Sequence, residues 1–200
     1  MNKITLVVLV IASLIIGLSS CKSLLKSRGL HPDFDSETYD LKGKKALIVT
    51  TSHGVLNKPG ETTGDSTGVF GSEMTVPYYE FLDANMEVHV ASIKGGQIPI
   101  DPSSFKRIIR TKSDERYLKD DIFQEKVKNS IPITEVDFTQ YDVVFFAGGW
   151  GAAYDMGQSD TLAKKVSHAY YNSDVLFGSV CHGALAFVSA KDSTGQSLIK

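Results

Sequence analysis

Four short apolar runs constrain the fold of this chain more than any other feature of its sequence. Each has six or seven residues and is rich in β-branched or aromatic side chains: residues 45–51, 87–92, 142–147 and 175–180. Such runs are typical of strands in a parallel sheet that is covered on both faces. We therefore expect these four segments to form one sheet.

The segments between these runs show the periodicity of helices. In residues 69–85 the apolar side chains recur about every 3.6 residues, and residues 115–129 and 159–171 repeat this pattern. Ser159 or Asp160 would cap the last of these helices. Strands that alternate with helices predict an α/β fold, a doubly wound sandwich with a mainly parallel sheet.

Three of the predicted strands end in residues that can carry chemistry. Ser52-His53-Gly54 follows the first, a glycine run at 147–151 follows the third, and Cys181-His182-Gly183 follows the fourth. In open α/β sheets, ligands bind beyond the carboxyl ends of the strands. We expect these three loops to meet at one rim of the sheet.

Cys181 lies at the predicted junction between a strand and a helix over residues 184–190. Free backbone N–H groups at a helix start favour a thiolate, and a sharp strand–nucleophile–helix turn exposes the reactive atom. A free cysteine is also often a small packing residue. Because His182 and Gly183 follow it directly, we favour a nucleophile.

Glu73 shares a predicted helix face with Phe70, Pro77 and Phe81, all of which are apolar. A carboxyl group on an inward face is desolvated, which raises its pKa and favours the protonated form. A neutral carboxyl could donate a hydrogen bond to a thiolate and then transfer a proton. The residues alone leave two alternatives open, a side chain that reaches solvent and a helix cap.

The glycine run at 147–151 brings backbone N–H groups close to a bound oxygen, as in an oxyanion hole, although such a run also marks ordinary turns. The G-x-G-x-x-G fingerprint of dinucleotide binding is absent, and the five histidines show no paired-ligand spacing. The net charge of −2 gives no basic excess, which argues against nucleic acid as a partner. We expect neither a metal nor a cofactor.

The first residues resemble a bacterial lipoprotein signal. Lys3 precedes an uncharged apolar stretch at 4–18, and Leu18-Ser19-Ser20-Cys21 resembles a lipobox. We expect a signal peptide at 1–20, lipid on Cys21, a tether at 21–43 and a domain at 44–200. The protein would then be exported and held on a membrane of the bacterial cell envelope. An uncleaved anchor helix is the alternative. If Cys21 carries lipid, Cys181 has no disulfide partner within the chain.

Four motifs in order resemble the PfpI superfamily, also called the DJ-1 superfamily: "TGVFGSEMTVPYYEFLDANMEVHVAS", "GGQIPIDPSS", "YDVVFFAGGWGAAYDM" and "VCHGALAFV". Within it, they are similar to the heat-shock chaperone branch that acts as glutathione-independent glyoxalase III. The resemblance covers residues 44–200. It implies a flavodoxin-like sandwich with a nucleophile elbow after a central strand. The implied enzyme converts methylglyoxal or related carbonyls to hydroxy acids without a cofactor.

The resemblance also implies residue roles. Cys181 matches the nucleophile, His182 its neighbour, and Glu73 the acid that hydrogen-bonds the nucleophile. The backbones of Gly149 and His182 match the oxyanion-binding pair. The partners implied are a small-molecule carbonyl substrate and, because dimers are usual in the family, a second copy of the chain.

Two features depart from the family pattern. Trp150 stands where the branch often has histidine, so we expect the indole to contact substrate and alter its choice. The sequence stops at Lys200, whereas family members continue, and a third, acidic triad residue would lie in that later part. Either the sequence is a fragment or the domain is C-terminally shortened, and in both cases we expect the missing elements to leave sheet edge and apolar surface uncovered.

Other functions are weighed against the glyoxalase. A non-catalytic holdase chaperone or a thiol redox sensor would use the same exposed cysteine differently. An amidase, a protease or a class I glutamine amidotransferase is a weaker alternative, because the G-x-C-x-G motif and the downstream His-x-Glu pair of the last group are absent.

Overall fold

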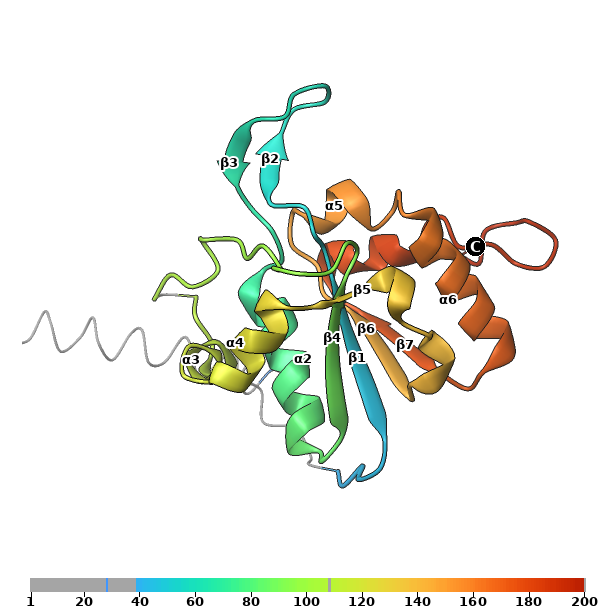
Figure 1. The fold of residues 1–200 in the computed structure, drawn as a ribbon, viewed down its shortest axis with the longest axis horizontal. Helices are drawn as coiled ribbons and strands as arrows, with labels where there is room; N and C mark the ends of the chain where they lie inside the picture. The colour runs from blue at the N-terminus through green and yellow to red at the C-terminus, as the bar shows by residue number, and fades with distance from the viewer. Residues whose placement is uncertain (1–27, 29–38, 108, 200) are drawn as a thin grey trace, which may run out of the picture. The chain divides into compact units, whose positions relative to one another are not determined.

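A computed structural model describes residue 28, residues 39–107 and residues 109–199 (Figure 1). The predicted signal peptide at 1–20, Cys21 and most of the tether at 21–43 lie outside the described residues. Among the residues that are described, no helix is long and apolar enough to cross a membrane.

A five-stranded parallel sheet forms the centre of the domain, in the order β5-β4-β1-β6-β7. Its strands are β1 (Lys45–Thr50), β4 (Glu87–Ser92), β5 (Ile131–Pro132), β6 (Val143–Phe146) and β7 (Leu176–Ser179). Four of them confirm the predicted strands to within one residue at each end. The predicted α/β class with a parallel sheet is confirmed.

Alternate residues of the strands pack into two separate cores. In β1, Ala46 and Ile48 face one core, whereas Leu47 and Val49 face the other. This is the two-residue period of a strand that is buried on both faces. The near-continuous apolar run in the sequence therefore reflects helices on both sides of the sheet.

Helices cover each face as the periodicity predicts (Figure 1). On one face lie α2 (Gly71–Asp83), α3 (Lys112–Tyr117) and α4 (Asp121–Lys128), and α6 (Asp160–Asn172) lies on the other. Ser159 caps α6 by accepting a hydrogen bond from the Leu162 N–H at 3.2 Å, which confirms one of the two predicted caps.

Several elements differ from the expectation. The segment 115–129 forms two helices, because the Asp120 side chain accepts a hydrogen bond from the Phe123 N–H at 3.0 Å and starts α4 anew. The hairpin β2 (Val55–Asn57) and β3 (Gly64–Ser66), and the short helix α5 (Ala152–Asp155), were not predicted. Short 3₁₀ helices, η1 (Ile133–Glu135) and η2 (Phe138–Gln140), connect β5 to β6.

The strand before Cys181 does not lie in the centre of the sheet as expected. Among the described residues β7 pairs only with β6 and ends the strand order. The sequence did not predict this position, because strand pairing depends on contacts between segments that are distant in sequence. The segment after it is also different: Cys181–Phe187 forms a 3₁₀ helix, η3, rather than a regular α-helix.

Gly183 lies directly against the end of strand β6. A Cβ atom there would collide with the carbonyl group of Phe146, the last residue of β6. We predict that Gly183→Ala lowers the free energy of unfolding by about 1–3 kcal/mol, because overpacking displaces backbone. Urea denaturation measures this change.

Gly157→Ala is the matched control, because its Cβ would lie 3.6 Å from the nearest atom, the Leu185 carbonyl oxygen, at ordinary contact distance. Its effect should stay within about 0.5 kcal/mol. Equal unfolding midpoints for the two variants would show that no side chain is excluded between Gly183 and the Phe146 carbonyl.

Candidate active site

The three loops expected at one rim do meet there. β6 pairs in parallel with both β1 and β7, so the carboxyl ends of all three strands lie at the same edge of the sheet (Figure 1). The glycine loop after β6 runs between the other two. Gly151 donates a backbone hydrogen bond to the Gly68 carbonyl at 3.1 Å, which ties this loop to the segment before α2.

Cys181 has the backbone conformation of a nucleophile elbow. Its φ of 53° lies in the left-handed region, which non-glycine residues seldom adopt. Such strain persists where the surrounding structure imposes it and is frequent at active sites. The thiol is free and exposed, and its Sγ lies 3.4 Å from Nδ1 of His182. The turn therefore presents a sulfur and an imidazole together.

Glu73 brings a buried carboxyl group to the same place from the first turn of α2. Its Oε2 atom is buried and has no hydrogen-bond partner among the described residues. Burial raises the pKa of Glu73, while the nearby Cys181 side chain and Gly148 backbone partly offset that rise. Since Oε2 makes no hydrogen bond of ordinary geometry with either, desolvation dominates. The expectation of an inward carboxyl with a raised pKa is confirmed.

The backbone of Gly148 lies between the Glu73 carboxyl and the His182 backbone nitrogen. A Cβ atom there would lie 2.5 Å from Oε2 of Glu73 and 2.8 Å from the backbone nitrogen of His182. The Gly148 carbonyl also accepts a hydrogen bond from the Phe70 N–H at 3.3 Å, directly before α2. Glycine is required at this position because the backbone itself fills the space between the two groups.

The backbone of Gly149 has a φ of 98°, and a side chain there would collide with the backbone of Phe70 and Gly68. The N–H groups of Gly149 and His182 donate no hydrogen bond to another described residue. Both donors are therefore free of protein partners among the described residues, and the oxyanion role that the family resemblance implies for them stays a prediction.

Trp150 extends the site beyond the histidine. Its ring centroid lies 4.8 Å from that of His182, with 37° between the planes, and the side chain is 55% exposed. The exposed indole thus lies beside the imidazole that neighbours Cys181.

His53 lies in the loop after β1 but does not contact Cys181 or His182. Its Nε2 atom contacts the Val55 carbonyl and Oδ1 of Asn57, and its ring stacks on Tyr154 at 4.2 Å. The imidazole therefore holds the hairpin against α5.

Asp155 is a site-adjacent residue that the sequence analysis missed. Its carboxylate accepts hydrogen bonds from the Ser52 N–H and the Thr51 hydroxyl, both at 2.8 Å, and burial raises its pKa. It fastens the end of β1 to α5. The signal available was a lone acidic residue shortly after the glycine run, which has no distinctive spacing.

Within the part of the chain that the structure describes, no group of three His, Cys, Asp or Glu side chains could hold a metal ion. The residues gathered at the rim are instead a thiol, an imidazole, a buried carboxyl and free backbone N–H groups.

The chain is similar to several known proteins. The model of the DJ-1/PfpI family matches residues 66–198. The chain is 29% identical over 163 residues to the glutathione-independent glyoxalase hsp3101 of Schizosaccharomyces pombe, covering 79% of this chain and 64% of the relative. It is also 29% identical to the glutathione-independent glyoxalase HSP31 of Saccharomyces cerevisiae, covering 78% of this chain and 65% of the relative. The chain thus spans just under two thirds of these relatives' length.

Solved structures show the same fold. The rapid encystment protein of Francisella tularensis superposes with a TM-score of 0.71 at 36% identity, over 78% of this chain and 67% of that one. Glyoxalase III of Candida albicans superposes with a TM-score of 0.67 at 27% identity, over 78% and 65%. The predicted flavodoxin-like architecture is confirmed.

The buried carboxyl predicts a specific pH dependence of stability. With its pKa raised above the ordinary 4.5, Glu73 binds more protons in the folded than in the unfolded state. Its contribution to stability is therefore lost as the pH rises above 4.5. We predict that Glu73→Gln has a higher Tm than wild type at pH 7 and an equal Tm near pH 4, measured by calorimetry.

Glu135→Gln, at an exposed residue of η1, is the control and should follow the wild-type curve at every pH. A Glu73→Gln curve that also runs parallel to wild type would show that the carboxyl is not desolvated.

Proposed function

This chain belongs to the DJ-1/PfpI family, and from that premise we propose that it is a cysteine-dependent, glutathione-independent glyoxalase that converts a 2-oxoaldehyde to a 2-hydroxy acid. The observation that carries the proposal is the group around Cys181. A strained, exposed thiol lies 3.4 Å from an imidazole nitrogen and beside a buried carboxyl of raised pKa. The names of the relatives hsp3101 and HSP31 support the same activity.

The first step is addition of Sγ of Cys181 to the aldehyde carbon. Nδ1 of His182 accepts the thiol proton as the carbon–sulfur bond forms and the carbonyl electron pair moves onto oxygen. The N–H groups of Gly149 and His182 stabilise that oxyanion. Return of the proton from His182 to the oxygen gives a hemithioacetal.

The second step moves hydrogen between the two carbons. His182 removes the hydrogen of the first carbon as a proton, while the neutral carboxyl of Glu73 protonates the oxygen on the second carbon, giving an enediol. His182 then protonates the second carbon, and Glu73 takes back the hydroxyl proton of the first. The product is a thioester, in which the first carbon is oxidised and the second is reduced.

Water then attacks the thioester and releases the 2-hydroxy acid and the Cys181 thiol. The overall change is addition of one water molecule per aldehyde. Because the oxidation and the reduction occur within one substrate, no external oxidant or reductant enters. The site supplies a nucleophile, a base, an acid and an oxyanion hole, which are the four functions that the reaction requires.

Loss of the nucleophile should abolish the activity. We predict that Cys181→Ser lowers the rate of methylglyoxal consumption by at least about 10³-fold. Glu73→Gln should lower it by about 10²–10⁴-fold, since an amide cannot transfer the proton. Chromatographic assay of methylglyoxal and lactate measures both.

Tyr170→Ala, on the exposed side of α6, is the matched control and should retain the wild-type rate. A Cys181→Ser variant that consumes methylglyoxal as fast as wild type would refute the proposal.

We further propose that the chain is a lipoprotein held on a membrane of the cell envelope through Cys21, and that it forms a homodimer. The sequence of residues 1–21 supports the anchor, and the family resemblance supports the dimer.

In bacteria that express the full chain, radiolabelled palmitate should enter the wild-type protein. Incorporation that persists in Cys21→Ser would contradict the anchor, and a monomeric mass in light scattering would contradict the dimer.

A further inference from the structure

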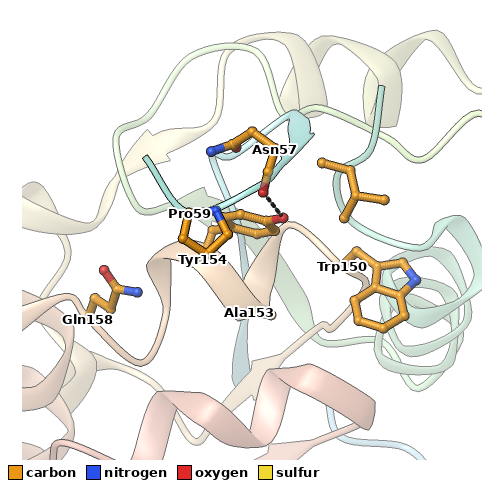
Figure 2. Close-up of a pocket in the computed structure, with 7 residues that line it drawn as sticks. Asn57, Pro59, Trp150, Ala153, Tyr154 and Gln158 are labelled. Atoms are coloured by element: carbon orange, nitrogen blue, oxygen red, sulfur yellow. Dashed lines mark hydrogen bonds between the residues drawn. The ribbon is translucent and has the colours of Figure 1, made fainter. Parts of the chain in front are cut away.

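A cavity of about 460 Å³ lies between the β2–β3 hairpin and α5 (Figure 2). The hairpin contributes Leu56 and Pro59 to its wall, and the segment around α5 contributes Trp150, Ala153 and Tyr154. Neither the hairpin nor α5 was predicted from the sequence. The cavity is therefore a feature that only the fold reveals, and none of the steps above uses it.

Trp150 connects this cavity to the nucleophile. Its indole lines the cavity and also lies 4.8 Å from the ring of His182, whose Nδ1 atom is 3.4 Å from Sγ of Cys181. A substrate bonded to Sγ through its first carbon carries its side group on the second carbon. Because Trp150 borders both His182 and the cavity, such a side group can extend along the indole into the cavity. A methyl group is far too small to fill this volume, which falls in the range of sites for larger organic ligands.

The chemistry of the wall selects an apolar, planar group. The lining is mostly apolar, and among the described residues no charged side chain takes part in it. A charged side group would lose hydration there without gaining a partner. The indole of Trp150 and the phenol ring of Tyr154 offer the flat surfaces that aromatic rings pack against, either offset or edge to face.

Tyr154 is held in place before any ligand arrives. One face of its ring stacks on His53 with centroids 4.2 Å apart and only 9° between the planes. Its hydroxyl donates a hydrogen bond to the Asn57 carbonyl at 2.8 Å, drawn in Figure 2. Because the ring is fixed at both its face and its tip, a ligand does not have to order it. This explains why His53 points to the hairpin rather than to Cys181.

We infer that this cavity binds the side group of the substrate, and that the preferred substrates are aromatic 2-oxoaldehydes rather than methylglyoxal. The inference rests on the proposed function and names the substrate class of that same site. With phenylglyoxal as substrate, the reaction adds one water molecule and yields mandelate, by the same internal oxidation and reduction. The phenyl group would pack against Trp150 and Tyr154.

Binding can be measured without turnover. Trp150 is the only tryptophan of the chain, so tryptophan fluorescence reports directly on the cavity wall. The Cys181→Ser variant is titrated with mandelate and, separately, with lactate, which has a methyl group in place of the ring. We expect a saturable fluorescence change with mandelate, and at least about 10-fold weaker binding of lactate.

Leu56→Asp places a carboxylate in the cavity wall at a side chain that is 42% exposed, so the fold should tolerate it. In the Cys181→Ser background it should weaken mandelate binding by at least about 10-fold with an unchanged Tm. Tyr170→Ala removes an aromatic ring elsewhere on the surface and should leave binding unchanged. Three results would overturn the inference. Lactate binds as tightly as mandelate, mandelate causes no fluorescence change, or mandelate binding is unchanged in Leu56→Asp.

Kinetics separate this inference from the proposed function. With Cys181 intact, kcat/KM for phenylglyoxal should exceed that for methylglyoxal by about 10-fold or more. Leu56→Asp should remove that preference, whereas Tyr170→Ala should retain it. If both aldehydes are consumed without preference, the inference fails and the glyoxalase proposal stands. If neither is consumed although mandelate binds, the glyoxalase proposal fails and the aromatic site stands.

Discussion

The site depends on the close approach of backbone segments at the ends of three parallel strands. At Gly148 and Gly149, after β6, and at Gly183, after β7, a side chain would collide with neighbouring backbone or with the Glu73 carboxyl. These glycines let α2, the glycine loop and the turn at Cys181 pack against one another with no side chain between them. Close packing of these backbone segments thus brings the elements that carry the carboxyl and the thiol together.

That packing also explains the contrast between the two reactive groups. Cys181 is exposed in a strained turn, where substrate can reach it, whereas Oε2 of Glu73 is buried and finds no hydrogen-bond partner in the described part of the chain. An unpaired carboxylate is unfavourable in such a place, so burial raises the pKa of Glu73 and favours its protonated form. Burial of the Glu73 carboxyl lowers the stability of the folded state and places a proton donor beside the Cys181 thiol. The holdase alternative gives no reason for this buried acid, and the relatives' names support the glyoxalase instead.

Much of this arrangement was predictable from sequence. Buried parallel strands are continuous apolar runs, so four strands and the meeting of their carboxyl ends followed from periodicity and from the general rule for α/β sheets. The inward face of Glu73 followed from helical spacing. The place of β7 at the end of the strand order did not, because strand order depends on pairings between distant segments. The β2–β3 hairpin, α5 and the contacts of Asp155 were missed because elements of three or four residues carry too little periodicity. The aromatic cavity was missed with them.

The central claim is that Cys181 bonds covalently to the substrate and that Glu73 then moves the proton. Rapid acid quenching followed by peptide mass spectrometry tests it directly. During turnover of methylglyoxal the account predicts an adduct of one substrate molecule on the peptide that contains Cys181, formed before lactate appears and accumulating in Glu73→Gln. Lactate production with no adduct on Cys181 at any time, in either protein, would contradict the account.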